Sequence, residues 1–412
     1  MFKAYPRHGV NLSAGCYSAA LKTLFRLSVL RGSKVKAFEE SFAEYIGVSH
    51  ALAVSSGRAA IYLACKALGL KEGDEFLMPA YTFHIVPLVI KACGLKPVFI
   101  DVLPGSYNID PALIEKNLTD RAGALMVTHM YGQPCEMESI LKIADRHGLK
   151  IIEDCAHACG ATYSGRKVGS FGDAGVFTFA MAKNMPCFGG GMITTKDAGI
   201  FKQLTGMIHT PASGMYKSLF KELLGTTINY LCTRRAVFPL FIFPLMRILN
   251  ALGSRAYDSE PGRETVSSGE VKTRYLTRLT NLQGAVGLHQ LTRIDKINDT
   301  VNRNAQVYNR ELEGVEGIEI PQVPPGRTHT FLYYRVEASD RENLRQKLFR
   351  KGVDTAPDDM SDCTTLAPFK DYGVELPVAS KLPSRILELP NNPSLKEKNI
   401  LHISRSVKDA LT

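Results

Sequence analysis

The sequence predicts an α/β protein built around a mainly parallel sheet, and two patterns in its first half support that prediction. Short apolar runs alternate with helix-length stretches, as in strands and helices that follow one another along the chain. The apolar runs are continuous rather than alternating, which is typical of strands buried on both faces. Ligands of such sheets bind beyond the carboxyl ends of the strands. Those ends are therefore where we look for functional residues.

The predicted elements follow one another in a regular order. Residues 33–47 carry apolar side chains at helical spacing with charges between them, and so predict an amphipathic helix. Strands are then predicted at 51–54, 75–78, 97–101, 124–127, 150–154, 175–179 and 192–195. Helices are predicted between them at 59–68, 86–93, from Pro111 onward, and at 137–147.

The pattern changes after Thr195. Residues 216–253 are basic and apolar, and residues 258–273 are polar, which suits an exposed connection. One long helix is expected over 280–313, and the clearest later strand over 331–337. We therefore expect a large domain over residues 1–255, with the basic apolar stretch 216–253 inserted in it, and a smaller C-terminal α/β domain over 256–412.

Composition excludes several classes of protein. The 412 residues are 45% hydrophobic and 22% charged, which excludes a wholly disordered chain. The net charge of +10 suits anionic ligands or an anionic membrane surface; no nucleic-acid-binding motif accompanies it, so we expect no nucleic acid partner. The odd number and scatter of the nine cysteines indicate reduced thiols of a cytoplasmic protein. We expect neither a secretory signal nor a membrane-spanning helix.

The most informative residues follow predicted strands. Asp154 ends a buried strand, Lys183 lies downstream after another strand, and Ser56-Gly57-Arg58-Ala59 stands where a strand gives way to a helix. A pyridoxal phosphate enzyme needs these three features in this order. Its lysine forms a Schiff base, an acidic partner keeps the pyridine nitrogen protonated, and a helix start with hydroxyls or a cation holds the phosphate.

A series of short motifs spans residues 35–410. They are Ser55-Ser56-Gly57-Arg58-Ala59-Ala60, Pro79-Ala80-Tyr81-Thr82-Phe83, Tyr131-Gly132-Gln133-Pro134, Glu153-Asp154-Cys155-Ala156-His157, Gly169-Ser170-Phe171-Gly172-Asp173, Lys183-Asn184, Gly189-Gly190-Gly191 and Arg278-Leu279-Thr280-Asn281-Leu282-Gln283. In these motifs and their order the sequence resembles the DegT/DnrJ/EryC1/StrS family of fold-type I pyridoxal 5'-phosphate (PLP) enzymes, mostly sugar aminotransferases. The resemblance implies PLP as cofactor.

The resemblance also implies roles for individual residues. Lys183 would be the catalytic residue, which forms the Schiff base and moves the proton between donor and cofactor. Asp154 would pair with the pyridine nitrogen, and Phe83 would stack on the ring. His157 falls where many relatives have a glutamine near the ring hydroxyl. The phosphate would be held by Ser56, Gly57, Arg58, Ala59 and Thr178.

Two departures from the family pattern concern the phosphate. Arg58 replaces a common threonine, and a guanidinium can still bind a phosphate. Relatives often send an asparagine from a Gly-Tyr-Asn-Tyr-Arg stretch into the partner subunit's phosphate site. The aligned segment here is Arg274-Tyr275-Leu276-Thr277-Arg278, so Leu276 stands in place of that asparagine. Compensation by Arg58 is a hypothesis.

The function implied by the resemblance is amino transfer from an amino acid, glutamate in most relatives, to a keto-sugar acceptor linked to a nucleotide. Such sugars enter surface polysaccharide, lipopolysaccharide or antibiotics, and the enzymes are usually homodimers. Three alternatives stay open: a sugar dehydratase of the same family, an aminotransferase acting on a lipid-linked substrate, and a catalytically idle regulatory protein. Dehydratases of the family have histidine where Lys183 stands, which argues against the first.

Two further features need separate interpretation. Cys155, His157 and Cys159 alternate, but no second cluster completes a zinc site, so we expect no metal. Residues 216–253 have three interpretations: a helical insertion packed on its own subunit or a dimer mate, an interfacial anchor on the inner face of the membrane, and a lid over a hydrophobic substrate. Arginines flank the apolar centre of that stretch at Arg234, Arg235, Arg247 and Arg255.

Overall fold

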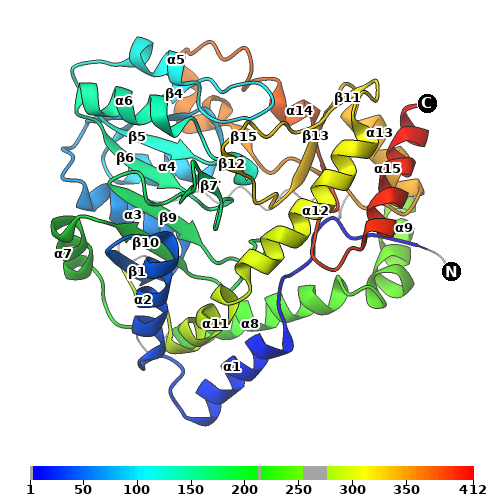
Figure 1. Ribbon diagram of the computed structural model, residues 1–412, viewed down its shortest axis with the longest axis horizontal. Helices are drawn as coiled ribbons and strands as arrows, with labels where there is room; N and C mark the ends of the chain where they lie inside the picture. Colours follow the sequence, from blue (N-terminus) through cyan, green and yellow to red (C-terminus); the bar gives the residue numbers. More distant parts are fainter. Residues whose placement is uncertain (1–2, 212–214, 254–275) are drawn as a thin grey trace.

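A seven-stranded sheet forms the centre of the protein (Figure 1). The computed structural model describes residues 3–211, 215–253 and 276–412. The strand order is β1-β10-β9-β6-β5-β2-β4; β9, β6, β5, β2 and β4 run parallel, and β10 pairs antiparallel with both β1 and β9. The strands are β1 (His50–Val54), β2 (Glu75–Pro79), β4 (Lys96–Ile100), β5 (Ala122–Thr128), β6 (Lys150–Asp154), β9 (Ala174–Thr178) and β10 (Gly191–Thr195). The predicted mainly parallel sheet is confirmed.

Helices cover both faces of this sheet, because successive side chains of a strand point to opposite sides. Leu52 and Val54 of β1 belong to a core shared with α3 and α4, whereas Ala51 and Ala53 belong to a second core shared with α2. A third core joins β5 and β6 to α6. The covering helices are α2 (Lys34–Ile46), α3 (Gly57–Ala67), α4 (Ile85–Ala92), α6 (Met137–His147) and α7 (Ala198–Met207).

Helix α2 shows how local sequence produces this packing. Val35, Phe38, Phe42 and Ile46 recur at intervals of three or four residues and are all buried. The helix ends at Gly47, whose φ of 82° is the left-handed conformation that glycine adopts without strain. The predicted amphipathic helix over 33–47 is therefore confirmed.

The prediction of one long helix in the second half of the chain is wrong. The long helix expected over 280–313 is two helices, α11 (Asn281–Leu291) and α12 (Ile294–Leu312). The chain bends between them, where Gln290 and Arg293 donate to the carbonyl of Asn11. A helix does start at Pro111, as predicted: it is the short α5 (Pro111–Ile114), which continues as a 3₁₀ turn, η1 (Glu115–Asn117). The strand predicted over 331–337 is present as β13 (Tyr334–Ala338), with its start shifted along the chain. Helix α1 (Ala14–Phe25) was not predicted.

The later part of the chain forms a second, four-stranded sheet in the order β11-β13-β16-β14. Helices α12 and α15 pack on it around a separate apolar core. Its elements are β11 (Ile318–Glu319), β13, α13 (Arg341–Arg350), β14 (Ala356–Pro357), α14 (Leu382–Arg385), β16 (Ile386–Leu389) and α15 (Glu397–Leu411). The predicted domain boundary near residue 256 lies outside the described residues.

Short strands tie the two parts of the chain together. β3 of the first half pairs with β15 of the second, and β12 of the second half pairs with β7, which also pairs with β8. These strands are β3 (Tyr81–Thr82), β7 (Thr162–Tyr163), β8 (Arg166–Lys167), β12 (Arg327–Thr328) and β15 (Ser361–Asp362). Two 3₁₀ segments follow β15, η4 (Cys363–Thr365) and η5 (Ala367–Tyr372), and a third, η2 (Met130–Gly132), follows β5.

The N-terminal segment crosses to the second sheet. Tyr5 pairs with Val353, Arg7 forms an ion pair of 2.7 Å with Asp354, and the His8 Nδ1 lies 2.8 Å from a carboxylate oxygen of Glu388. The N-terminal segment is therefore anchored to the second sheet and the residues next to it by contacts with the late part of the sequence.

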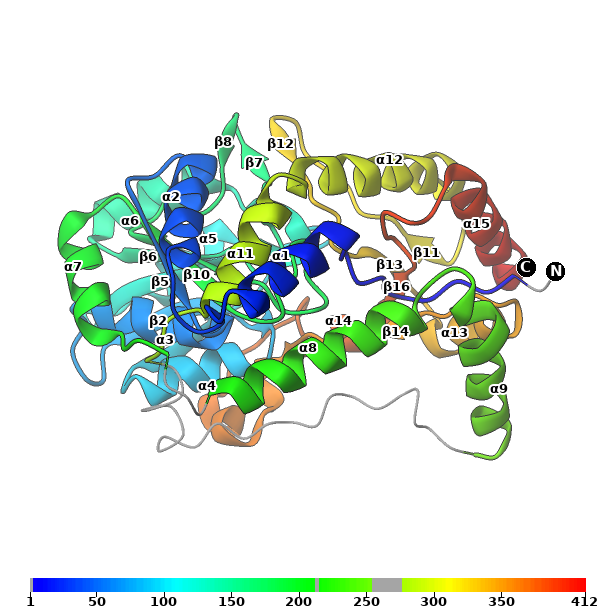
Figure 2. The ribbon, with the colours of Figure 1, turned by 90° about the horizontal axis from the view of Figure 1, so that it is seen from below.

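The basic apolar stretch is helical, as one interpretation expected. It forms α8 (Met215–Cys232), a turn of π-helix, η3 (Phe238–Ile242), and α9 (Phe243–Ala251) (Figure 2). Helix α8 touches α1 through a hydrogen bond of 3.3 Å from the Tyr17 hydroxyl to Thr227. Phe238 and Phe243 pack with Ala4 and Phe349 in a small apolar core. None of the described helices has the length and apolar character needed to cross a bilayer.

We expect Phe42→Ala to lower the free energy of unfolding by about 3–5 kcal/mol, because it leaves a cavity among tightly packed rings. Phe42 is fully buried and lies against Phe38, Phe177 and Phe179 at centroid distances of 5.0–5.8 Å. Urea unfolding measures the loss. The matched control is Phe25→Ala on α1, where the ring is 82% exposed, and it should change stability by less than about 0.5 kcal/mol. Equal losses in the two variants would contradict the packing described.

The His8–Glu388 pair predicts a pH dependence of stability. Burial lowers the pKa of the His8 imidazole, but Glu388 more than offsets this, so that the pKa lies above its ordinary value. A raised pKa in the folded state contributes stability below about pH 6.5, which is lost as the pH rises through the folded pKa. We expect His8→Gln to reduce the difference in unfolding free energy between pH 6 and pH 9, measured by urea unfolding. An unchanged difference would show that the pair does not act this way.

Candidate active site

The predicted phosphate turn packs against the end of strand β9. Ser56 forms a bridge with Gly190, and its hydroxyl caps α3 by accepting from the Ala59 N–H at 3.1 Å. A Cβ added to Gly57 would lie 2.8 Å from the Cβ of Thr178, so only glycine allows this approach. The turn therefore combines the positive end of a helix with the Ser56 and Thr178 hydroxyls, and Arg58 stands in the first turn of α3.

Asp154 and Lys183 lie close enough for their charges to interact. Asp154 ends β6 and is 6% exposed, and it accepts from the Ala156 N–H at 3.0 Å. Burial raises the pKa of the Asp154 carboxyl, while the Ala156 N–H and Lys183 oppose that rise. Burial lowers the pKa of the Lys183 amine, with Asp359 and Asp154 opposing the change. Each charge therefore favours the ionised form of the other.

The loop that carries Lys183 is held by three side-chain amides. Asn184, next to the lysine, donates to the Asn298 side chain at 2.9 Å. Gln290 donates to the Pro186 carbonyl at 2.9 Å, and Gln283 donates to the Phe188 carbonyl at 2.7 Å. These partners lie on α11 and α12. The two helices that replace the predicted single one therefore hold the backbone of the lysine loop in place.

His157 and Phe83 complete the predicted set. The His157 Nδ1 accepts from the Tyr131 N–H at 3.2 Å, and its ring stacks on Tyr131 at a centroid distance of 5.9 Å. Burial and the Lys183 charge lower the pKa of His157 well below its ordinary value, so the ring is neutral and Nε2 carries the hydrogen. Phe83 follows β3, and its ring contacts that of His84 at 4.5 Å. The roles assigned to these residues stay a prediction.

Sequence reasoning missed a charged cluster that faces the same lysine. Arg335 of β13 is 2% exposed, and its guanidinium lies 4.1 Å from the centre of the Tyr131 ring. It donates to Asp359 at 2.8 Å and to Glu388 at 3.2 Å, and also pairs with Asp358. An arginine inside an apolar strand, and two consecutive aspartates, were the signals in the sequence.

Asp359 brings a negative charge to Lys183. Burial alone would raise the pKa of the Asp359 carboxyl, but the positive charges of Arg335 and Lys183 lower it to about 2. The carboxylate is therefore ionised at any pH at which the protein would work. The charge of Lys183 is therefore favoured by two acidic groups, Asp154 from the central sheet and Asp359 from the loop between β14 and β15.

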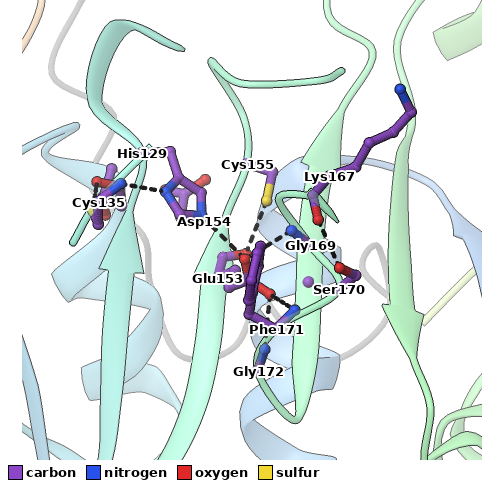
Figure 3. A network of polar contacts seen from close by, with 12 residues as sticks. His129, Cys135, Glu153, Asp154, Cys155, Lys167, Gly169, Ser170, Phe171 and Gly172 are labelled. Atoms are coloured by element: carbon purple, nitrogen blue, oxygen red, sulfur yellow. Dashed lines mark hydrogen bonds and ion pairs between the residues drawn. The ribbon is translucent and has the colours of Figure 1, made fainter. Parts of the chain in front are cut away.

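A buried network fixes β6 next to Asp154 (Figure 3). Glu153 is fully buried and accepts from the N–H groups of Gly169, Phe171 and Gly172 at 2.7–2.8 Å. His129 accepts from the Cys135 N–H through Nδ1, so its Nε2 carries a hydrogen and donates to Glu153 at 3.2 Å. The motif at residues 169–173 thus serves a buried carboxylate one residue from Asp154.

The same network contains side chains that could bind a metal. Ligand atoms of His129, Glu153 and Cys155 lie within 4.8 Å of one another. The Glu153 carboxylate is already occupied by hydrogen-bond donors, and His129 uses both ring nitrogens. Burial raises the pKa of the Cys155 thiol well above its ordinary value, whereas a metal needs the thiolate. Hydrogen bonding accounts for this cluster.

Comparison with known proteins agrees with this geometry. The model of the DegT/DnrJ/EryC1/StrS aminotransferase family matches residues 18–230 and 244–408. The chain is 29% identical to the UDP-N-acetyl-3-dehydro-alpha-D-glucosamine 3-aminotransferase of Acidithiobacillus ferrooxidans, over 95% of this chain and 92% of that protein. It is 30% identical to the dTDP-3-amino-3,4,6-trideoxy-alpha-D-glucose transaminase of Streptomyces venezuelae, over 92% of this chain and 88% of that protein.

The chain is also similar in structure to a solved aminotransferase. The crystal structure of S. venezuelae DesV, in complex with a ketimine intermediate, has a TM-score of 0.74 and 28% identity, and covers 97% of this chain and 94% of that one. The fold expected from the resemblance is confirmed. The chain belongs to the DegT/DnrJ/EryC1/StrS aminotransferase family.

Proposed function

We propose that this aminotransferase uses PLP bound at Lys183 to move an amino group from an amino acid, glutamate, to a keto-sugar activated by a diphosphate-linked carrier. The observation that supports this most is a lysine whose charge interacts with both Asp154 and Asp359, together with a helix start suited to a phosphate. The relatives named above act on UDP-linked and dTDP-linked sugars. A nucleotide-linked acceptor is the first candidate for this chain, for use in polysaccharide or antibiotic sugar synthesis.

The residues present fit the cofactor. The buried Asp154 carboxylate would hold the pyridine nitrogen, and the His157 Nε2–H would donate to the ring hydroxyl. Phe83 would cover one face of the ring. The phosphate would lie on Ser56, Gly57, Arg58 and Ala59, with Thr178 beside them, because a helix start and hydroxyls suit a dianion. When bound, PLP supplies an electron sink that stabilises a carbanion.

Lys183 performs the proton transfer in this proposal. Burial lowers the pKa of its Nζ, which raises the fraction of neutral amine able to accept a proton from the donor's α-carbon. Asp154 and Asp359 oppose this lowering of the Lys183 pKa. The protonated amine therefore stays accessible and can donate the proton in the second part of the transfer. A lysine and an aspartate both in position favour the aminotransferase over the dehydratase and over an idle regulatory protein.

Lys183→Ala is expected to abolish the visible absorbance that PLP gives when it is covalently bound, because Nζ of Lys183 is the amine that the proposal assigns to the covalent bond. After borohydride treatment, mass spectrometry of the wild type should show the cofactor on the peptide that contains Lys183. Glutamate should replace the visible band of the wild type by one at shorter wavelength. The matched control is Lys142→Ala, at an exposed position on α6, which should behave as wild type. A trapped adduct of equal yield in Lys183→Ala would refute the assignment.

We further propose a homodimer, as the resemblance implies. The segment aligned with the partner-reaching stretch of relatives begins outside the described residues, since Arg274 and Tyr275 are not described. From Leu276 on it lies along its own chain: the Thr277 carbonyl accepts from Ser55 at 3.0 Å, and Leu276 accepts from His209 at 2.6 Å. Leu276 offers a phosphate no hydrogen bond, and Arg58 is the residue we propose to compensate.

The exposed face of the insertion supports contact with the inner surface of the cytoplasmic membrane. Large apolar side chains of α8, η3 and α9 are about half exposed or more. They are Tyr216, Phe220, Leu224, Ile228, Leu231, Leu240, Phe241, Leu245, Ile248 and Leu252. Exposed cations accompany them: Lys217, Lys221, Arg234, Arg235 and Arg247. This combination is typical of helices that lie in an anionic membrane interface.

A second copy of the chain is a less suitable partner than a membrane for this exposed face. In a twofold interface the same patch meets itself, so the exposed lysines and arginines of the insertion would face one another. Glu222 is the acidic residue among residues 215–253. We therefore assign the insertion to the membrane and place the proposed dimer contact elsewhere.

Vesicle co-sedimentation tests the membrane contact. Wild-type protein should bind vesicles containing an anionic lipid at low salt, and bind less at high salt, because screening weakens the attraction. Phe220→Glu and Phe241→Glu, at side chains 67% and 68% exposed, should each reduce binding several-fold. The control is Val374→Glu, 37% exposed and far from the insertion in sequence. Equal binding by all variants, or a change only in the dimer seen by ultracentrifugation, would contradict the proposal.

A further inference from the structure

An apolar pocket lies between the insertion and the loop of the catalytic lysine. Its volume is about 370 Å³, within the range of about 300–1,000 Å³ usual for ligand sites. Side chains from three parts of the chain line it: Val10 of the N-terminal segment, Met181 near Lys183, and Phe238, Ile242, Met246 and Leu249 of the insertion. Met181 and Ala182, which immediately precede Lys183, both border it.

The charged groups at this pocket are already paired. Arg7 is bound to Asp354 through 2.7 Å and 3.0 Å hydrogen bonds, and His8 is bound to Glu388 at 2.8 Å. These are the cationic side chains among the residues that line the pocket. A diphosphate placed here would therefore have to break an ion pair, whereas an apolar group would not.

Part of the pocket wall lies outside the match to the family model. The family match runs over residues 18–230 and 244–408 and so leaves out residues 231–243. Cys232, Thr233, Phe238 and Ile242, which border the pocket, come from that omitted stretch. The segment outside the family match therefore contributes to the wall of a pocket that Met181 and Ala182, just before Lys183, also border.

We propose that this pocket binds a hydrocarbon chain carried by the amino acceptor. The proposal rests on the proposed function and adds to it the class of substrate: a keto-sugar bearing either an acyl substituent or a lipid carrier. Methylene groups are the chemistry that both sources share, and the Met, Leu, Ile and Phe side chains match it. The exposed apolar face of the same helices would lie at the membrane, where such acceptors reside.

Calorimetric binding of chain-length series to the holoenzyme tests this. The probes are butyl, octyl and dodecyl diphosphate, each below its micelle concentration, and UDP-glucosamine N-acylated with two, eight or twelve carbons. Within a series, affinity should rise by about fourfold per added methylene until the pocket is full. The series that shows the steeper rise identifies the source: alkyl diphosphates for a lipid carrier, acylated UDP-sugars for an acyl substituent.

Two substitutions that place a larger side chain in the pocket are used, so that the conclusion does not depend on a single variant. Leu249→Trp and Met246→Trp should each weaken binding of the twelve-carbon probes at least about tenfold, and flatten the dependence on chain length. The matched control is Ile248→Trp on the same helix, where the side chain is 58% exposed, and it should keep the wild-type dependence. All three variants should still show the spectral change with glutamate, since the donor needs no chain.

The outcomes separate the two proposals. Affinity that does not depend on chain length in the wild type, or is reduced equally by Ile248→Trp, would overturn the hydrocarbon site. So would loss of UDP binding itself in the filled variants, because the pocket would then hold the nucleotide. Failure of the proposed aminotransferase appears differently, as a wild type that gives no spectral change with glutamate while still binding the probes.

Discussion

The arrangement of the site depends on hydrogen bonds that hold a buried loop inside the protein. Residues 184–188 are buried, and a buried backbone carbonyl or amide without a partner costs stability. Asn184, Gln283 and Gln290 bind this loop to α11 and α12. Lys183 stands at the start of this loop. The contacts that the following residues make therefore hold the backbone from which the lysine side chain extends. A flexible lysine side chain would otherwise sample many positions.

The charges around the lysine come from separate parts of the fold. Asp154 belongs to the central sheet, while Asp359 lies in the loop between β14 and β15 and is held by Arg335 of the second sheet. The acidic pair therefore depends on the contact between the two sheets. A change in that contact would alter the charge around Lys183 without touching the residue itself. This design differs from the Glu153 network, in which the acidic group and most of its partners lie within residues 129–172.

Local sequence predicted much of the fold, and the reasons differ from element to element. Strands such as β6 are short, apolar and bounded by polar residues, so their limits are visible in the sequence, and the prediction of 150–154 matched. The break between α11 and α12 was not visible, because Thr292 and Arg293 are compatible with a helix and the bend depends on distant partners at Asn11 and Pro186. Helix α1 was not predicted either. Several of its large apolar side chains are exposed, so they do not form the buried stripe by which an amphipathic helix is identified.

The site could be predicted only where a motif marks it. Asp154, Lys183 and the turn at Ser56 follow strands and carry recognisable chemistry, and they do end near one another. Arg335, Asp359 and Glu388 lie in a region with weak motifs, and only folding brings them to the lysine. The apolar pocket was beyond prediction, since it needs Val10, Met181 and Leu249 to converge from three distant segments.

The crossing of the N-terminal segment has a consequence for how the protein is made. Arg7 and Asp354 are 347 residues apart in sequence, and their contact cannot form until Asp354 has left the ribosome. Contacts of such long range close slowly. Until then the nascent chain must keep the segment around Arg7 unpaired, with its apolar side chains available to chaperones. Stalling shortly before Asp354 emerges would yield a polypeptide that has every strand of the central sheet but cannot anchor this segment.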